Sequence, residues 1–149
     1  ANESHEKMSA FDHVTTESAV KTYEAAKGVF TALLDEVREL SRKKPEATLS
    51  ASKVKLINAL LVDLLTFLEK EPEGKYLHAL DDSALPQTSD ALMMMVQFEA
   101  ALSAYKKRYY RSVSGRGYSS SLRYWITEEQ LSEWGSLDED SDFDDGDSQ

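Results

Sequence analysis

The 149-residue sequence contains no cysteine, and proline and glycine occur only three and six times. The absence of cysteine excludes disulfides and thiolate chemistry, and it leaves the compartment open, with a reducing cytoplasm as the favoured expectation. No hydrophobic run is long enough to cross a bilayer. The N-terminal stretch ANESHEKMSAFDH also lacks the basic and apolar regions of a signal peptide. These features are typical of a globular protein without a membrane partner.

Residues that usually carry catalysis or bind metal ions are scarce and scattered. The three histidines, His5, His13 and His78, are not paired at the four-residue spacing that places two ligands on one helical face. The stretch DSDFDDGD resembles a calcium-binding loop, but its glycine is seventh from Asp140 where the EF-hand loop needs it sixth, and the chain shown ends before a twelfth residue. We therefore expect no metal, no cofactor and no enzymatic activity.

Acidic residues are concentrated at the C-terminal end. The net charge is -10, and residues 126–149 hold ten of the 27 acidic residues but no lysine or arginine. The remaining residues are balanced, with 17 acidic and 17 basic side chains. A segment this charged cannot bury enough apolar surface to fold, so we predict a disordered acidic tail over residues 136–149. Residues 1–14 are polar and unpatterned and predict a flexible arm, which leaves residues 15–135 as one helical domain.

Apolar residues recur at spacings of three and four over three long stretches, which is the periodicity of amphipathic helices. These stretches predict helices over about 15–43, 50–70 and 89–111. Shorter helices are expected over 75–80 and 127–134. Ser50 is placed to cap the second long helix, and Thr127 with Gln130 forms a capping box before the last short one. The predicted fold is all-α: a small antiparallel bundle of three long helices plus short helices, followed by the disordered tail.

The second long helix is apolar on nearly every side. Between Leu60 and Leu68 only Asp63 and Thr66 are polar, so we expect this helix to be central and covered on several sides. The rest of a 149-residue chain with three long helices has too little surface to cover every apolar side of this helix. The sequence therefore predicts self-association, most simply a homodimer. Asn58 and Asp63 are the polar residues that such a helix would bury.

The stretch YKKRYYRSVSGRGYSSSLRYW, residues 105–125, differs most from its surroundings. It carries six basic and six aromatic side chains, and no acid lies between Glu99 and Glu128. Part of this pattern fits the end of a helix, where cations are favoured by the helix dipole. Beyond Gly115 the alternation of Leu122, Tyr124 and Ile126 fits either a short strand or an extended docking segment.

Two binding functions remain open for this segment. Tyrosine, tryptophan and arginine are the commonest anchors of protein interfaces, so the leading hypothesis is a non-enzymatic helical interaction module, such as an adaptor, accessory or inhibitor-like subunit. Aromatic rings interleaved with cations also suit single-stranded nucleic acid or RNA, with the acidic tail masking the segment and discouraging adventitious nucleic-acid binding. The candidate partner-binding residues are Lys106, Lys107, Arg108, Arg111, Arg116, Tyr118, Arg123, Tyr124, Trp125 and Trp134.

Overall fold

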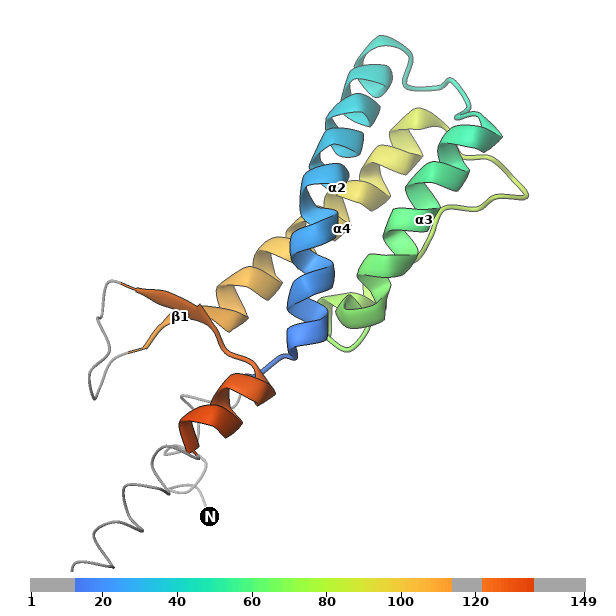
Figure 1. Cartoon of the computed structure of the whole chain (residues 1–149). Helices are drawn as coiled ribbons and strands as arrows, with labels where there is room; N and C mark the ends of the chain where they lie inside the picture. Colours follow the sequence, from blue (N-terminus) through green and yellow to red (C-terminus); the bar gives the residue numbers. More distant parts are fainter. Residues whose placement is uncertain (1–12, 114–121, 136–149) are drawn as a thin grey trace, which may run out of the picture. The chain divides into compact units, whose positions relative to one another are not determined.

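The computed structural model describes residues 13–113 and 122–135, which form a mostly helical protein (Figure 1). The chain divides into two compact units. The helical unit is Lys21–Lys106, and the terminal unit combines residues 1–20 with residues 107–149. The predicted tail, and the predicted arm apart from residues 13 and 14, lie outside the described residues, so those domain limits stay predictions. Within the described part of the chain, no helix is both long and apolar enough to cross a membrane.

The long helices lie within two residues of their predicted positions. They are α2 (Glu17–Lys43), α3 (Ala51–Leu68) and α4 (Thr88–Tyr109). Ser50 caps α3 as predicted, because its hydroxyl accepts a hydrogen bond from the Lys53 amide at 3.2 Å. The short helix expected over 75–80 is instead a 3-10 helix, η2 (Pro72–Tyr76), which begins at the proline. Proline favours the first position of a helix, where no amide donor is needed.

An aromatic cluster joins the three helices of the helical unit. Tyr23 of α2 stacks on Tyr105 of α4 with ring centroids 5.6 Å apart, and Phe67 of α3 lies 4.8 Å from Tyr105 and 6.5 Å from Tyr23. A second contact, 6.5 Å between Phe30 and Phe98, joins α2 to α4 nearer the middle of both helices. Tyr105 is fully buried. No buried side-chain nitrogen or oxygen among the described residues lacks a hydrogen-bond partner.

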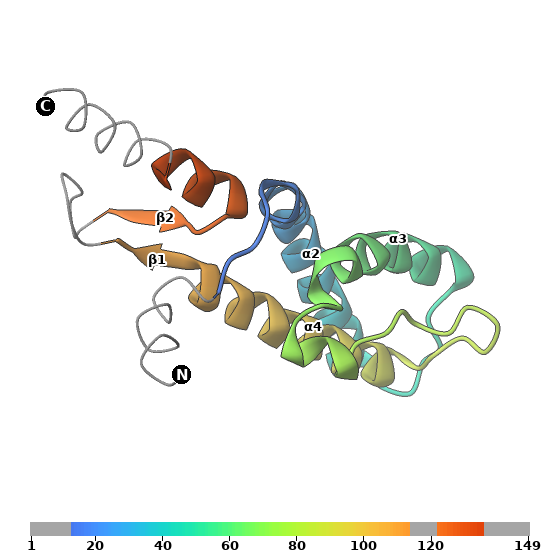
Figure 2. The same cartoon turned by 90° about the horizontal axis from the view of Figure 1, so that it is seen from below.

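The same contacts set the helix directions. Tyr23 lies near the start of α2, whereas Phe67 and Tyr105 lie near the ends of α3 and α4. Both α3 and α4 therefore run opposite to α2 and in the same direction as each other (Figures 1 and 2). The predicted antiparallel arrangement thus holds for α2 with either neighbour but not for α3 with α4. The physical reason is the long connection over residues 69–87, which returns the chain to the start of α3 before α4 begins.

The prediction that α3 is covered on several sides is wrong. Its buried residues form one face: Val54, Ile57, Leu61, Leu64, Phe67 and Leu68. Outside that face, Leu56 is 58 % exposed and Val62 is 54 % exposed. Asp63 is exposed as well, so α3 buries no acid.

Polar contacts hold the two connections of the helical unit in place. Asn58 is half-buried, and its side chain exchanges two hydrogen bonds of 2.8 Å with the backbone of Leu80, which fixes the 69–87 connection against α3. At the other end, the buried Thr88 hydroxyl donates to the carbonyl of Lys44 at 2.6 Å and lies 3.0 Å from that of Pro45. Carbonyls at a helix end lack partners within the helix, so Thr88 ties the start of α4 to the end of α2.

The terminal unit contains a small sheet, which corrects the all-α prediction. Strands β1 (Tyr110–Ser112) and β2 (Arg123–Trp125) pair antiparallel. Helix α4 ends at Tyr109, two residues before the predicted end, because the Ile126 amide donates to the Tyr109 carbonyl at 2.8 Å and starts the ladder. Of the two alternatives for residues 122–126, the short strand is the one observed. The last described element is a helix over residues 128–135.

Replacing Leu64 with alanine tests the core. Leu64 is completely buried, so Leu64→Ala should lower the free energy of unfolding by about 2–5 kcal/mol through lost burial and the cavity left behind. The control is Val62→Ala on the same helix, which should cost less than about 0.5 kcal/mol because that side chain is exposed. Chemical denaturation followed by circular dichroism measures both. Equal losses for the two variants would contradict the assignment of the buried face.

Thr88→Val tests the tie between α2 and α4. The variant keeps the shape of the side chain but removes the buried hydroxyl, so the Lys44 and Pro45 carbonyls keep only the Ala47 and Ser89 amides as donors. The loss of this hydrogen bond should cost about 0.5–1.5 kcal/mol. Thr66→Val is the matched control, since the Thr66 hydroxyl also donates to a backbone carbonyl, that of Asp63 at 2.6 Å, but in an exposed position. A Thr88 variant as stable as the Thr66 variant would show that the hydroxyl has no structural role.

Candidate functional site

Within the basic and aromatic segment, β1 and β2 pair as a β-hairpin whose two faces differ. The register pairs Tyr110 with Trp125, Arg111 with Tyr124 and Ser112 with Arg123. Side chains alternate between the faces of a strand, so the first and third pairs share one face and the second pair occupies the other. We call Tyr110, Arg111, Arg123, Tyr124 and Trp125 the hairpin surface.

Backbone geometry explains why two large rings meet on the first face. The Ile126 amide bonds to the Tyr109 carbonyl, which makes that pair a hydrogen-bonded one. The next pair, Tyr110 and Trp125, is then of the non-hydrogen-bonded type, in which side chains approach most closely. Their ring centroids are 5.1 Å apart at 49°. Both residues are only half-buried, so this aromatic pair remains accessible.

The second face joins the hairpin to the helix over 128–135. Tyr124 meets Trp134 edge-on, with ring centroids 6.1 Å apart and an interplanar angle of 88°, and the helix lies beside β2 in Figure 2. The predicted cap is present at its start, where the Thr127 hydroxyl accepts from the Gln130 amide at 3.0 Å. Trp134 is a predicted partner-binding residue, and the structure brings its ring into contact with Tyr124.

The hairpin is also anchored to the start of α2, within the same unit. The Thr15 amide donates to the Ile126 carbonyl at 3.0 Å, and the Glu128 amide donates to the Thr15 carbonyl at 2.8 Å. A carboxylate oxygen of Glu129 accepts from the Glu17 amide at 3.1 Å. A negative charge is favoured at a helix N-terminus, where amides lack partners. Sequence reasoning missed this anchor, because its two parts are more than a hundred residues apart and carry no distinctive motif.

The predicted basic residues differ in how close they lie to the strands of the hairpin. Arg111 and Arg123 lie on the strands, and the Arg108 guanidinium lies 6.0 Å from the ring centre of Tyr109. Lys107 is exposed in the last turn of α4, and Lys106 before it is the last residue of the helical unit. For both lysines, the favourable interaction of a cation with the helix dipole is sufficient to explain why a basic residue occurs at the end of α4. Two further predicted residues, Arg116 and Tyr118, lie outside the described residues.

The described residues offer little for chemistry. They contain no group of three or more histidine, aspartate or glutamate side chains able to hold a metal ion. His78 is exposed, and its Nδ1 lies 2.8 Å from the Ala79 carbonyl. Hydrogen bonds from the Ala84 amide, the Ser83 hydroxyl and the Ser83 amide hold the pKa of Asp81 below its usual value, but this carboxylate closes a surface turn.

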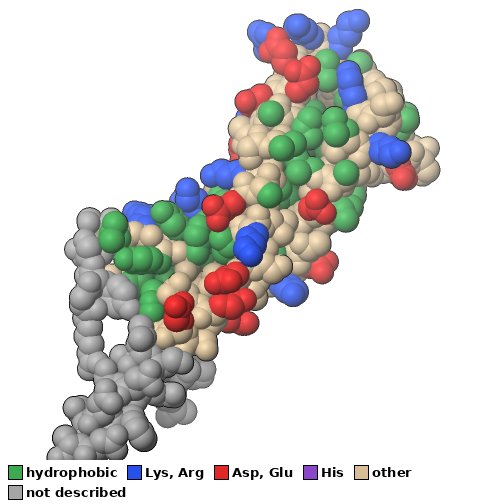
Figure 3. Space-filling view, in the orientation of Figure 1, with side chains coloured by type: hydrophobic (Ala, Val, Ile, Leu, Met, Phe, Trp, Pro, Cys, Tyr) green, Lys and Arg blue, Asp and Glu red, His purple; other side chains and the backbone are tan. Residues whose placement is uncertain are grey.

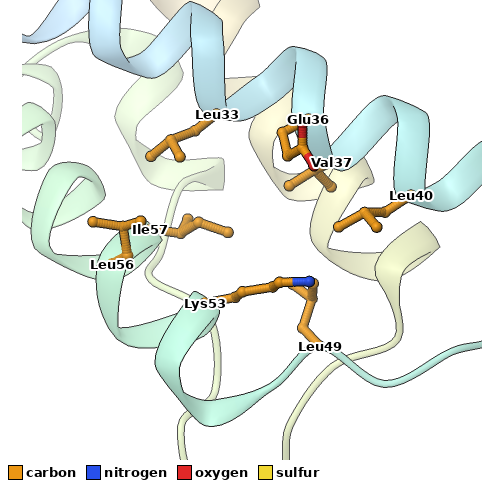
Figure 4. A pocket seen from close by; sticks show the side chains of 8 residues that line it. All are labelled: Leu33, Glu36, Val37, Leu40, Leu49, Lys53, Leu56 and Ile57. Atoms are coloured by element: carbon orange, nitrogen blue, oxygen red, sulfur yellow. The ribbon is translucent and has the colours of Figure 1, made fainter.

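A second surface, on the helical unit, was not predicted. An open apolar groove of about 170 Å³ lies between α2 and α3. Its lining, shown in Figure 4, comprises Leu33, Glu36, Val37, Leu40, Leu49, Lys53, Leu56 and Ile57. The helical periodicity places Leu33 and Leu40 on the apolar stripe of α2, but it cannot reveal that α3 leaves the edge of that stripe uncovered.

Comparison of the chain with protein families, with curated proteins and with solved structures found no match.

Glu129→Ala tests the anchor of the hairpin. Removal of the carboxylate that caps the start of α2 should lower the free energy of unfolding by about 0.5–1 kcal/mol. Glu133→Ala is the matched control, because it removes the same charge from an exposed position one turn later, and it should change stability by less than about 0.3 kcal/mol. Chemical denaturation measures both. Equal effects would show that only net charge matters and that the 3.1 Å contact contributes nothing.

Proposed function

We propose that this protein is a non-enzymatic helical interaction module that binds another protein through the hairpin surface and self-associates through its helical unit. The observation that supports the first part is the partly exposed pair of Tyr110 and Trp125, with Arg123 on the same face of the hairpin. Tryptophan, tyrosine and arginine supply most of the binding free energy in protein interfaces. Because the hairpin fixes these side chains in position before binding, less conformational entropy is lost when a partner binds.

Two features favour a protein over single-stranded nucleic acid as the ligand. Stacking on bases needs open ring faces, whereas the rings of Trp125 and Tyr124 already contact Tyr110 and Trp134. The helix over 128–135 also places three exposed or partly exposed acids in the same unit as the hairpin cations: Glu128, Glu129 and Glu133. Such acids oppose the phosphate contacts that dominate nucleic-acid affinity. Nucleic-acid binding, with masking by the acidic tail, remains the alternative, and a cytoplasmic location remains a prediction.

Trp125→Ala tests the protein-binding proposal. Affinity capture with the full-length protein, followed by mass spectrometry, should recover a specific partner that the variant loses. Trp125→Phe should retain most of the binding, because phenylalanine can still pack on Tyr110. Tyr76→Ala is the control for loss of an exposed aromatic ring elsewhere, since Tyr76 is 62 % exposed on the helical unit. Circular dichroism checks that each variant is folded. A partner retained equally by all variants would contradict the role of the hairpin surface.

A titration of single-stranded RNA separates the two ligand classes. The proposal predicts negligible binding at physiological salt by the full-length protein and by a chain that ends at Gly135. The alternative predicts tighter binding by the shortened chain, with affinity falling as salt rises by about 0.7 log units per log unit of salt for each phosphate contacted. Tighter RNA binding by the shortened chain that is lost in the double variant Arg111→Ala, Arg123→Ala would support nucleic-acid binding and contradict the proposal of a protein ligand.

A further inference from the structure

The groove between α2 and α3 is open although its lining is almost entirely apolar. Figure 4 shows Leu33 and Val37 from α2 on one side and Leu56 and Ile57 from α3 on the other. On the face shown in Figure 3, hydrophobic side chains follow the line where the two helices meet. Burial of such side chains on binding is favourable at about 25 cal/mol for each Å² removed from water.

Both rims of the groove leave large apolar side chains in water. On the α3 rim Leu56 is 58 % exposed, and on the α2 rim Val29, one helical turn before Leu33, is 54 % exposed. Ala25 and Ala32 are also exposed on α2, close to Val29 on the helix surface. Small side chains of this kind allow another helix to approach closely. The groove and its rims thus have the shape and polarity of a helix-packing surface.

The groove carries one charge of each sign, and each charge belongs to a different helix. Glu36 projects from α2 and Lys53 from α3. Within the described residues neither side chain takes part in a salt bridge, although four other salt bridges form on α2 or between α2 and α4. An acid on one rim and a base on the other make the surface complementary in charge to a copy of itself.

We infer that the occupant of this groove is a second copy of the chain, related by a twofold axis parallel to the groove. This rotation lays α2 of each copy over α3 of the other at the same height. Glu36 then faces the partner subunit's Lys53 in two equivalent pairs, while Leu56 packs against Val29 and Leu33 of the other α2. Twofold interfaces are self-complementary in this way. The inference rests on the self-association in the proposed function, and it is independent of the hairpin surface.

The exposed face of α4 is the main rival surface for self-association. Met93 is 68 % exposed and Val96 is 40 % exposed on that helix. Asp90 is the exposed acid beside Met93, but Gln97, Ala100 and Ser103 continue this face without a base to pair with it in a second copy. The α2–α3 groove is favoured because it combines apolar surface with a charge pattern that specifies the copy and its orientation.

The first test measures the mass of the full-length chain by light scattering and sedimentation over a range of micromolar concentrations. The inference predicts twice the mass of one chain, with dissociation on dilution. Leu56→Lys should weaken the dimer at least about tenfold, because it places an additional charge in the apolar contact. Val62→Lys is the matched control on the opposite flank of α3, with nearly the same exposure, and should leave the dimer unchanged.

The second test exchanges the two charges. Glu36→Lys and Lys53→Glu should each weaken the dimer about tenfold, because both intermolecular pairs become repulsive. A mixture of the two variants should form heterodimers, since every cross-pair then joins a lysine to a glutamate. Pairing between Glu36 and Lys53 within one chain cannot explain the formation of heterodimers, because each variant carries two like charges in its own groove.

The outcomes separate this inference from the wider proposal. A folded monomer at all concentrations overturns it, as does a dimer that is lost with Met93→Lys and kept with Leu56→Lys. A mixture of the charge variants that stays monomeric overturns the twofold arrangement. None of these results bears on capture of a partner by the hairpin surface. Loss of that capture by Trp125→Ala, in turn, leaves the predicted dimer unaffected.

Discussion

The helical unit depends on the contact between Tyr23, Phe67 and Tyr105. It joins the first turns of α2 to the last turns of both α3 and α4, so all three helix directions follow from one cluster. Because α3 and α4 run the same way, the chain needs the long connection over 69–87 between them. That connection is held by Asn58 and by close packing at Gly74, where a side chain would collide with the backbone of Leu68 and Glu69.

This arrangement accounts for the surface that remains available. Helix α3 turns one apolar face to the cluster and leaves Leu56 beside an open groove. We propose that a second copy covers the groove, guided by the separate positions of Glu36 and Lys53. The terminal unit offers a different kind of surface, in which a hairpin holds partly exposed rings and arginines together. Assembly and partner binding would then use separate residues.

Helical periodicity predicted the three long helices, and the preference of serine for the N-cap position predicted the Ser50 cap, because both depend on residues close together in the sequence. The β-hairpin needed pairing between residues 110 and 125 across a loop, and the Thr15 anchor needed contact with Thr127. Local patterns do not encode such distant contacts. Composition also identified Tyr124, Trp125 and Trp134 as candidate site residues, but not their ring contacts. The apolar character of α3 predicted a helix covered on several sides, whereas the structure of the single chain leaves Leu56 and Val62 exposed.

Hydrogen–deuterium exchange of the full-length protein at high and low concentration locates any self-association along the chain. If a second copy covers the groove, amides of residues 29–40 and 53–60 exchange more slowly at high concentration. Amides of residues 110–112 and 123–125 should exchange at the same rate in both samples. Exchange that is independent of concentration everywhere, or protection confined to the hairpin or to α4, would show that the groove is not the dimer interface.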